Sequence, residues 1–161
     1  MGESWYDTAQ ICKNGHLVTE CYKFLPVHAE KFCSKCGAGT ITKCSHCDAK
    51  IRGAYNVTGG GGSSEYEVPL YCYSCGEAYP WTEEKIKAVK EFSNETDLSS
   101  EDKKIIEENI QSIVVVSPNT QVAAVKIKKV LLKVGGAFAQ KLQDMIVDIA
   151  SETAVKLIKG N

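Results

Sequence analysis

The chain has 161 residues, which is enough for one domain or two small ones. Its formal net charge is −1, so no overall positive charge draws it to nucleic acid or to an anionic membrane. The sequence has no run of 18 apolar residues and no secretory signal at its start, so we expect no membrane-spanning helix and a cytoplasmic location. In a reducing compartment, paired cysteines bind metal or do redox work more often than they form disulfides.

The first half of the chain carries eight cysteines, six of them in three C-x-x-C pairs. A C-x-x-C turn lets two thiolates converge on one tetrahedral ion, whereas a redox centre would need one such pair beside a βαβ pattern. The string Cys12-Lys-Asn-Gly-His16 offers two more ligands. The sequence thus predicts two structural Zn²⁺ ions, and the predicted ligands are Cys12, His16, Cys33, Cys36, Cys44, Cys47, Cys72 and Cys75.

Eight ligands can be shared between two ions in three ways. Sequential pairing places residues 12–36 at one ion and residues 44–75 at the other. A cross-brace, as in RING domains, joins the first turn with the third, and nested pairing joins the inner two turns. Only seven residues separate Cys36 from Cys44, which is short for enclosing an ion and favours the sequential arrangement.

The motifs ICKNGH and FCSKCG resemble the half-ribbon pattern C-x-N-G-H…F-C-x-x-C-G of bacterial double zinc ribbon proteins. The longer string YDTAQIC-NGH…KFCSKCGAGTI…C-x-x-C…IRGAY…YCYSCGEAYPWTEE resembles an uncharacterised bacterial family of such proteins, over about residues 6–85. This resemblance implies a zinc-ribbon fold and bound zinc, with His16 in place of a cysteine ligand. It implies no established activity.

Cys21 and His28 fall outside the pattern. Either could replace His16 as the fourth ligand, because a thiolate suits zinc as well as an imidazole does. The alternative is that Cys21 is a small buried side chain and that His28 lies on the surface. His46 lies inside the Cys44–Cys47 turn, where we expect it to be exposed.

Residues 51–58 and 65–71 are rich in β-branched and aromatic side chains and predict the two strands of a long hairpin. Between them lies GGGGSS, whose Gly59–Gly62 run predicts a flexible tip that a partner could order. A phosphate-binding loop is disfavoured there because no Lys-Ser/Thr follows.

The second half reads as amphipathic helices. Thr82 begins a helix to about Asn94, and Ser99 caps a second one with Asp102 in the position of a capping box. A third helix over 119–134 follows the Ser117-Pro118 start, and a last one covers 137–158. The predicted fold class is α+β: a double zinc-ribbon domain with short antiparallel strands over 1–81, then a helical domain of three to four helices over 82–161.

Charge is distributed unevenly along these helices. Residues 82–108 carry five bases and nine acids, whereas residues 109–161 carry seven lysines and three acids. This asymmetry suits a contact between helices or a charged partner. The candidate partner surface is a group of lysines without an intervening acid: Lys126, Lys128, Lys129 and Lys133.

These features predict a non-enzymatic zinc-ribbon adaptor whose helices bind a protein or a second copy of the chain. No catalytic constellation stands out, and all eight ligands are needed to close two sites. The alternative is a nucleic-acid-binding ribbon that stacks bases on its tyrosines, although the chain holds a single arginine, Arg52. A membrane-surface contact through 119–134 and an enzyme, either ubiquitin-ligase-like or using the Cys21 thiol, are weaker alternatives.

Overall fold

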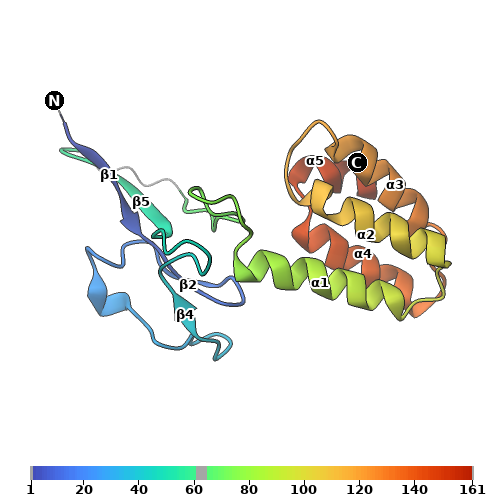
Figure 1. Ribbon diagram of the computed structural model, residues 1–161, viewed down its shortest axis with the longest axis horizontal. Helices are drawn as coiled ribbons and strands as arrows, with labels where there is room; N and C mark the ends of the chain where they lie inside the picture. The colour runs from blue at the N-terminus through green and yellow to red at the C-terminus, as the bar shows by residue number, and fades with distance from the viewer. Residues whose placement is uncertain (1, 61–64, 161) are drawn as a thin grey trace. The chain divides into compact units, whose positions relative to one another are not determined.

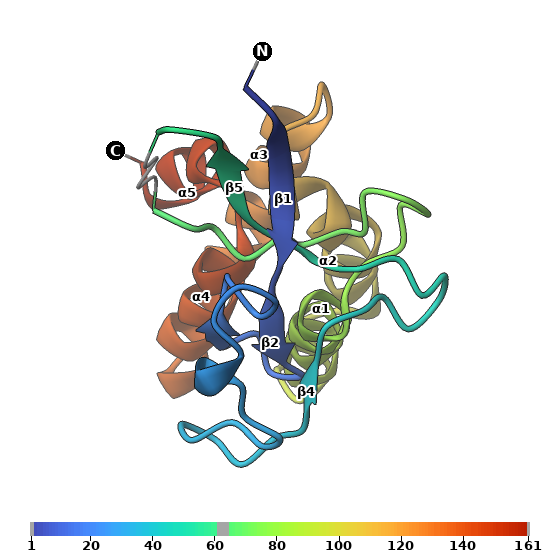
Figure 2. The same cartoon turned by 90° about the vertical axis from the view of Figure 1, so that its left-hand side faces the viewer.

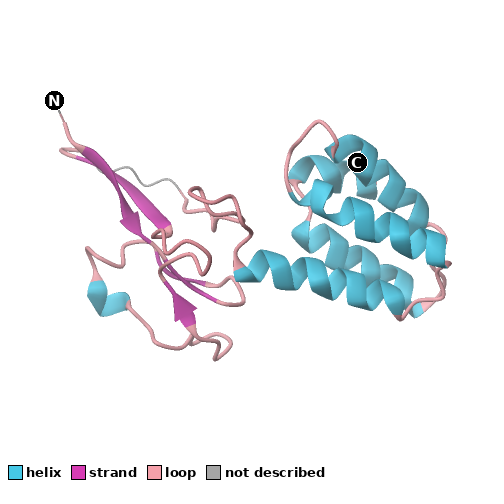
Figure 3. Ribbon diagram, in the orientation of Figure 1, coloured by secondary structure: helices cyan, strands magenta, loops and turns pink. Residues whose placement is uncertain are grey.

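The structure is a computed structural model that describes residues 2–60 and 65–160 (Figure 1). The chain divides into two compact units, Met1–Glu83 and Glu84–Asn161. Figure 3 shows short strands in the first unit and helices in the second. The predicted α+β class is therefore confirmed.

Two small antiparallel sheets form the frame of the first unit. Strand β1 (Ser4–Thr8) pairs with β5 (Arg52–Val57), and the two strands lie side by side in Figures 1 and 2. The other sheet has the order β3-β2-β4, with β2 (Gln10–Cys12) between β3 (Leu17–Thr19) and β4 (Thr40–Ile41). The short helix η1 (Pro26–His28) belongs to the loop between β3 and β4.

The predicted hairpin of residues 51–58 with 65–71 is wrong. The first segment does form β5, but its partner is β1 near the N-terminus, through the register Trp5↔Asn56 and Tyr6↔Tyr55. Among the described residues of the second segment, only Tyr71 pairs, with Ala78. A cross-strand pair of tyrosines, Tyr6 and Tyr55, has ring centroids 5.0 Å apart and favours this pairing.

Residues 61–64 of the predicted glycine tip lie outside the described residues. Gly59, at φ = 82°, turns the chain immediately after β5, and the Gly60 amide donates to the Val57 carbonyl at 3.3 Å.

Two buried polar side chains fix the loop between β3 and β4. The Asp7 carboxylate accepts hydrogen bonds from the amides of Lys23 and Phe24, at 3.0 and 3.1 Å. Gln10 bonds both the amide and the carbonyl of Glu30, at 3.0 and 2.8 Å. These bonds hold the loop in place where it has little apolar core to rest on, since Phe24 is 78% exposed.

The core of the first unit is small. It consists of a few aliphatic residues, two cysteines and an aromatic pair in which the rings of Tyr79 and Trp81 stack 4.7 Å apart. The buried members are Ala9, Ile11, Cys44, Ile51, Cys72, Tyr79 and Trp81. So little apolar burial favours additional stabilisation by metal.

Five helices follow: α1 (Pro80–Asn94), α2 (Ser100–Val114), α3 (Thr120–Leu131), α4 (Ala137–Ile149) and α5 (Glu152–Lys159). Ser99 caps α2 as predicted, since its hydroxyl accepts the Asp102 amide at 3.1 Å. The isoleucine stripe of α2 is fully buried against α3 to α5, in a core that includes Ile106, Ile110, Ile113, Ile127, Leu142, Ile146 and Ile158.

The helix predicted over 137–158 is in fact two helices. The chain leaves α4 at Ala150, whose backbone is extended, and begins α5 after Ser151. The Ser151 amide donates to the Ile113 carbonyl at 2.7 Å, so the break satisfies a backbone group at the end of α2. The start of α3 also differs from the prediction, because Pro118 and Asn119 form a turn and the first helical residue is Thr120.

None of the helices in the described part of the chain combines the length and the apolar character that crossing a bilayer requires.

Candidate metal centres

The structure brings the eight predicted ligands together in two clusters, and it does so sequentially along the chain. The nitrogen and sulfur atoms within each cluster all lie within 4.8 Å of one another. One cluster consists of Cys12, His16, Cys33 and Cys36, and the other of Cys44, Cys47, Cys72 and Cys75. All eight cysteines of the chain are free of disulfides.

The distances within each cluster match the edges of a metal tetrahedron. Sulfur atoms about 2.3 Å from a central zinc lie about 3.8 Å apart. In the first cluster the Cys12 and Cys36 sulfurs are 3.8 Å apart, and His16 Nδ1 lies 3.5 Å from the Cys12 sulfur. In the second cluster, Cys44 to Cys75 measures 3.8 Å and Cys47 to Cys72 measures 3.7 Å. Both clusters could therefore hold a metal ion.

Three of the four chain turns that carry the ligands are built alike. In each C-x-x-C turn, the residue before the first cysteine forms a bridge with the residue seven positions later. The backbone amide of the first cysteine also donates a hydrogen bond to the carbonyl five residues later. The distance is 2.8 Å in each pair: Cys33 to Ala38, Cys44 to Ala49 and Cys72 to Glu77. The bridged pairs are Phe32↔Gly39, Lys43↔Lys50 and Tyr71↔Ala78.

Each ligand turn also needs one residue in the left-handed region of the backbone. Glycine supplies it in three turns, at Gly15, Gly37 and Gly76, with φ between 73° and 87°. In the third turn along the chain Asp48 adopts φ = 59°, a conformation that aspartate tolerates better than most residues. Gly15 is doubly constrained, because a Cβ there would lie 3.0 Å from the Cβ of Trp81.

The two clusters share an arrangement of buried and exposed ligands. The first cysteine of every pair is buried, as at Cys33 and Cys44, and the second is exposed, as at Cys36 and Cys47. Cys12 is buried and His16 is half-buried. Each ion position is thus closed by the core on one side and lies near the surface on the other.

Comparison with protein families gives a match that covers nearly the whole chain. The model of a family described as "Uncharacterized protein conserved in bacteria (DUF2321)" matches residues 5–158. The chain belongs to the DUF2321 family. The predicted resemblance to an uncharacterised bacterial family is thereby confirmed. No curated protein and no solved structure matches the chain.

In this DUF2321 chain, polar groups around the sulfurs favour their charged form. The Ala38 amide, with help from His16 and Asn14, lowers the pKa of Cys36 to about 6. The side-chain Nδ2 of Asn14 donates a hydrogen bond to the Cys36 sulfur at 3.4 Å. Burial opposes ionisation of Cys72, but hydrogen bonds from the amides of Cys75 and Ser74 and from the thiols of Cys47 and Cys75 lower its pKa to about 6.

At Cys75 the neighbouring thiols disfavour ionisation. Despite a favourable hydrogen bond at Glu77, burial and the sulfurs of Cys47 and Cys72 raise the pKa of Cys75 to about 12. Four sulfurs this close cannot all ionise unless a cation compensates their charge. The second cluster is therefore chemically suited to a metal cation, whose binding would release the remaining protons.

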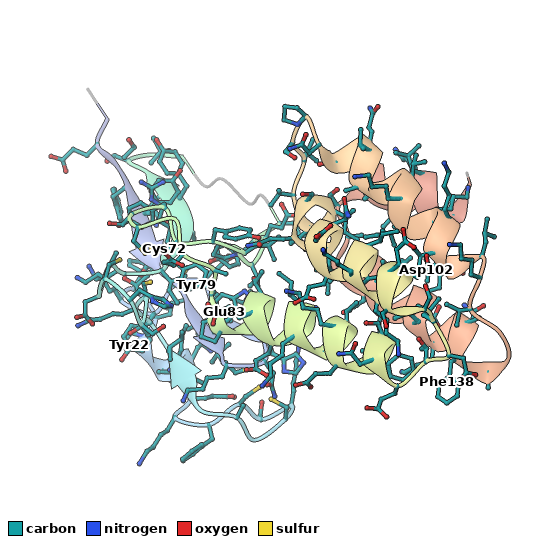
Figure 4. All side chains as sticks on the ribbon, turned by 45° about the vertical axis from the view of Figure 1, so that its right-hand side comes forward. Tyr22, Cys72, Tyr79, Glu83, Asp102 and Phe138 are labelled. Carbon is teal, nitrogen blue, oxygen red and sulfur yellow. The ribbon has the colours of Figure 1, made fainter. Side chains whose placement is uncertain are left out.

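The sequence pattern predicted the residues that form the two clusters but not the residues that surround them. Tyr79 is buried near Cys72, and burial, followed by the charge of Cys72, raises the pKa of Tyr79 (Figure 4). The Asn-Gly dipeptide before His16 was a signal for the support that Asn14 gives to Cys36.

The remaining candidate ligands lie elsewhere in the chain. Cys21 is half-buried and belongs to neither cluster. His28 is exposed on η1. His46 Nε2 lies 4.0 Å from the Glu83 carboxylate and is 46% exposed.

The four candidate lysines of α3 and its C-terminal end fall into two groups. Lys128 Nζ donates to the Leu157 carbonyl at 3.0 Å, and Lys133 Nζ to Asp102 at 2.7 Å. Lys126 and Lys129 are exposed. A role of these lysines in partner binding stays a prediction.

Proposed function

We propose that the chain is a non-enzymatic, zinc-dependent interaction module of the cytoplasm. The observation that carries this proposal is the presence of two complete sets of four ligand atoms, each within 4.8 Å. Zinc in a structural site is tetrahedral and takes all its ligands from the protein, whereas a catalytic zinc keeps one position for water or substrate. Four side chains at each ion leave no such position.

Zinc would then act as the main stabiliser of the first unit. That unit has few buried apolar residues and short strands, so it has little hydrophobic free energy to offset the entropy of ordering. Binding a structural Zn²⁺ to a thiolate site contributes a large favourable term. A reducing cytoplasm would keep the eight thiols available for metal.

The second unit supplies a surface for the association. On α3 and its C-cap residue, the side opposite the core carries Val122, Val125 and Leu132, which are 57%, 42% and 79% exposed. These positions follow helical spacing and therefore share one face with the exposed Lys129. An apolar stripe beside lysines suits a protein partner with acidic groups or a second copy of this chain.

The observations weigh against nucleic acid as the ligand. The tyrosines that could stack on bases include Tyr55, Tyr66 and Tyr73, and all three line a pocket that Glu20 and Glu65 also line. Phosphate binding is driven by clustered positive charge.

The zinc part of the proposal is tested by chelation of the full chain. Both tryptophans, Trp5 and Trp81, lie in the first unit, so tryptophan fluorescence reports on that unit, whereas circular dichroism at the helical band reports mainly on α1 to α5. We expect two Zn²⁺ per chain by native mass spectrometry. A strong chelator should change the fluorescence of Trp81, which is 3% exposed, and leave most of the helical signal. An unchanged fluorescence after complete metal removal would contradict the proposal.

The association part is tested by light scattering coupled to gel filtration. If the α3 stripe binds a second copy, replacing Val122, Val125 and Leu132 with serine should reduce the measured mass while the zinc content stays the same. If the wild-type chain is monomeric, the partner is another protein, and the same triple variant should lose it in a pull-down. A variant that keeps all its partners would overturn the assignment of this surface.

A further inference from the structure

The first unit contains a pocket of about 460 Å³ that neither metal cluster uses. Residues of β1, of β5 and of the segment 65–73 contribute to its lining. The lining is rich in aromatic side chains, and its six tyrosines are Tyr6, Tyr55, Tyr66, Tyr71, Tyr73 and Tyr79.

The charged residues at this pocket are mainly acidic. Glu20, Glu65 and Glu67 line it together with Arg52, so three carboxylates face one guanidinium and the formal sum is −2. Within residues 2–60 and 65–160, none of these four side chains forms an ion pair. Burial and, after it, the negative charge of Glu20 raise the pKa of Tyr66. A metal held by four thiolates in the adjacent cluster would add further negative charge.

One cationic side chain of the protein, Arg52, already lies against the tyrosine rings of the pocket. Arg52 Cζ lies over the ring of Tyr73 at 3.8 Å from its centroid and over the ring of Tyr6 at 4.7 Å. Tyr6 in turn packs on Tyr55, with centroids 5.0 Å apart. The faces of aromatic rings attract guanidinium and ammonium groups, so this row of rings is suited to cations.

The pocket walls are held in place by hydrogen bonding, and part of their aromatic surface is exposed to solvent. The Tyr66 hydroxyl donates to the Arg52 carbonyl at 2.6 Å, which ties residues 65–67 to β5. Tyr6, Tyr55 and Tyr73 are each about half exposed, at 50%, 50% and 53%. Ring surface is therefore available for a ligand, and little ordering entropy would be lost on binding it.

We propose that this pocket binds a lysine or arginine side chain of a partner polypeptide, with the tyrosine faces stacking on the cation and the glutamates pairing with its charge. The negative sum selects a cation over a carboxylate or a phosphate, and the volume accommodates one long side chain with its neighbouring backbone. The site goes beyond the α3 association surface and shares no residue with it, so either can fail without the other.

The test uses the full, zinc-loaded chain and three fluorescent probes in anisotropy titrations. The probes are a short peptide of alternating glycine, lysine and arginine, the same peptide with glutamate in place of each base, and an oligothymidylate. We expect the basic peptide to bind and the other two not to bind. Preference for the acidic peptide or the oligonucleotide would overturn the proposal, and so would the absence of binding by the basic peptide.

Variants separate the pocket from general attraction between opposite charges. We expect two variants to lower the affinity for the basic peptide by about fivefold or more: the double substitution Glu65→Gln with Glu67→Gln, and Tyr73→Ala alone. The first removes a pair of carboxylates and the second removes one aromatic face. The matched control Glu3→Gln with Glu77→Gln makes the same change of net charge outside the pocket lining and should have little effect. Tyr73→Phe keeps the ring face and should keep the affinity.

Zinc content and circular dichroism establish that each variant is folded before it is titrated. If the Glu65/Glu67 variant and the Glu3/Glu77 control lose the same affinity for the basic peptide, net charge alone attracts the peptide. That result would overturn the proposed pocket site. Loss of affinity in Tyr73→Phe, in a chain that retains two Zn²⁺, would overturn stacking as the means of recognition.

Discussion

Lys133 Nζ donates a 2.7 Å hydrogen bond to Oδ1 of Asp102, although the two residues are 31 positions apart in the sequence. The Asp102 side chain is only 8% exposed. The other carboxylate oxygen, Oδ2, accepts the Ser99 hydroxyl at 3.0 Å. The contact therefore connects the C-terminal end of α3 to the N-terminal cap of α2. Lys133, one of the lysines predicted to form a partner surface, therefore also has a contact within the chain.

This contact predicts a loss of stability in acid. The hydrogen bond from Lys133 is the largest cause, with Ser99, that lowers the pKa of Asp102 below its ordinary value of 3.8. A folded-state pKa below the unfolded value gives stability that is present above the unfolded pKa and lost as the pH falls through the folded pKa. Between about pH 6 and pH 3, thermal melts followed at the helical band should therefore show a smaller decrease in Asp102→Asn than in the wild type. Lys133→Met should behave like Asp102→Asn, and a wild-type acid response in both variants would contradict the prediction.

The caps of α2 and α5 predict opposite responses to the same substitution. The Ser99 hydroxyl accepts the Asp102 amide, so Ser99→Ala should cost about 1 kcal/mol and lower the melting temperature by roughly 4–8 °C. Ser151 also precedes a helix, but in the described part of the chain its buried hydroxyl has no hydrogen-bond partner. Ser151→Ala should therefore be neutral or slightly stabilising. Calorimetry of the two variants compares them directly, and an equal loss in both would refute this account.

Cys21 is predicted to be dispensable for metal. It lies outside both clusters, and burial, followed by the charges of Asp7 and Glu20, raises the pKa of its thiol above the ordinary value of 9.0. Cys21→Ser should keep two ions per chain, whereas Cys33→Ser should lose the ion of the first cluster. Substitution with Co²⁺ gives a second measure, because the thiolate-to-metal absorption should be unchanged in Cys21→Ser and reduced in Cys33→Ser. A chain that loses metal on Cys21→Ser would restore Cys21 as a ligand.

Gly53 in β5 predicts a severe packing defect. A Cβ there would overlap the carbonyl oxygen of Glu20 and lie 2.8 Å from the Thr8 carbonyl carbon. Gly53→Ala should therefore destabilise the first unit by roughly 3 kcal/mol or more, and the chain should lose Zn²⁺ at a lower chelator concentration. Gly39→Ala is the control, because its Cβ would meet nothing within 4 Å. Similar chelator midpoints for the two variants would contradict the prediction.

The two clusters of candidate metal ligands could be predicted from the sequence because the spacing of their residues is set by local turns. Three C-x-x-C pairs and Cys12-Lys-Asn-Gly-His16 each fold within a few residues, and the short link from Cys36 to Cys44 indicated how the turns would be shared. The α2 helix was also predictable, since both its cap at Ser99 and its isoleucine stripe are local patterns.

The errors concern features that depend on distant parts of the chain. Residues 51–58 have strand propensity, but propensity alone does not determine the partner strand. The partner is β1 near the N-terminus and not the predicted segment 65–71. The break at Ala150 carries no glycine or proline. It is made by the Ile113 carbonyl of α2, which accepts the Ser151 amide, and that contact exists only after α2 and α4 have packed.

The alternation of an enclosed and an outward-facing cysteine in each pair has a consequence for durability. Peroxide or a related oxidant reaches the sulfurs of Cys36, Cys47 and Cys75 before those of their enclosed neighbours. Oxidation of one such atom would remove it as a ligand and leave its ion with three. The lifetime of the first unit under oxidative stress should therefore be set by these three exposed sulfurs, while the buried sulfurs would be the last to react.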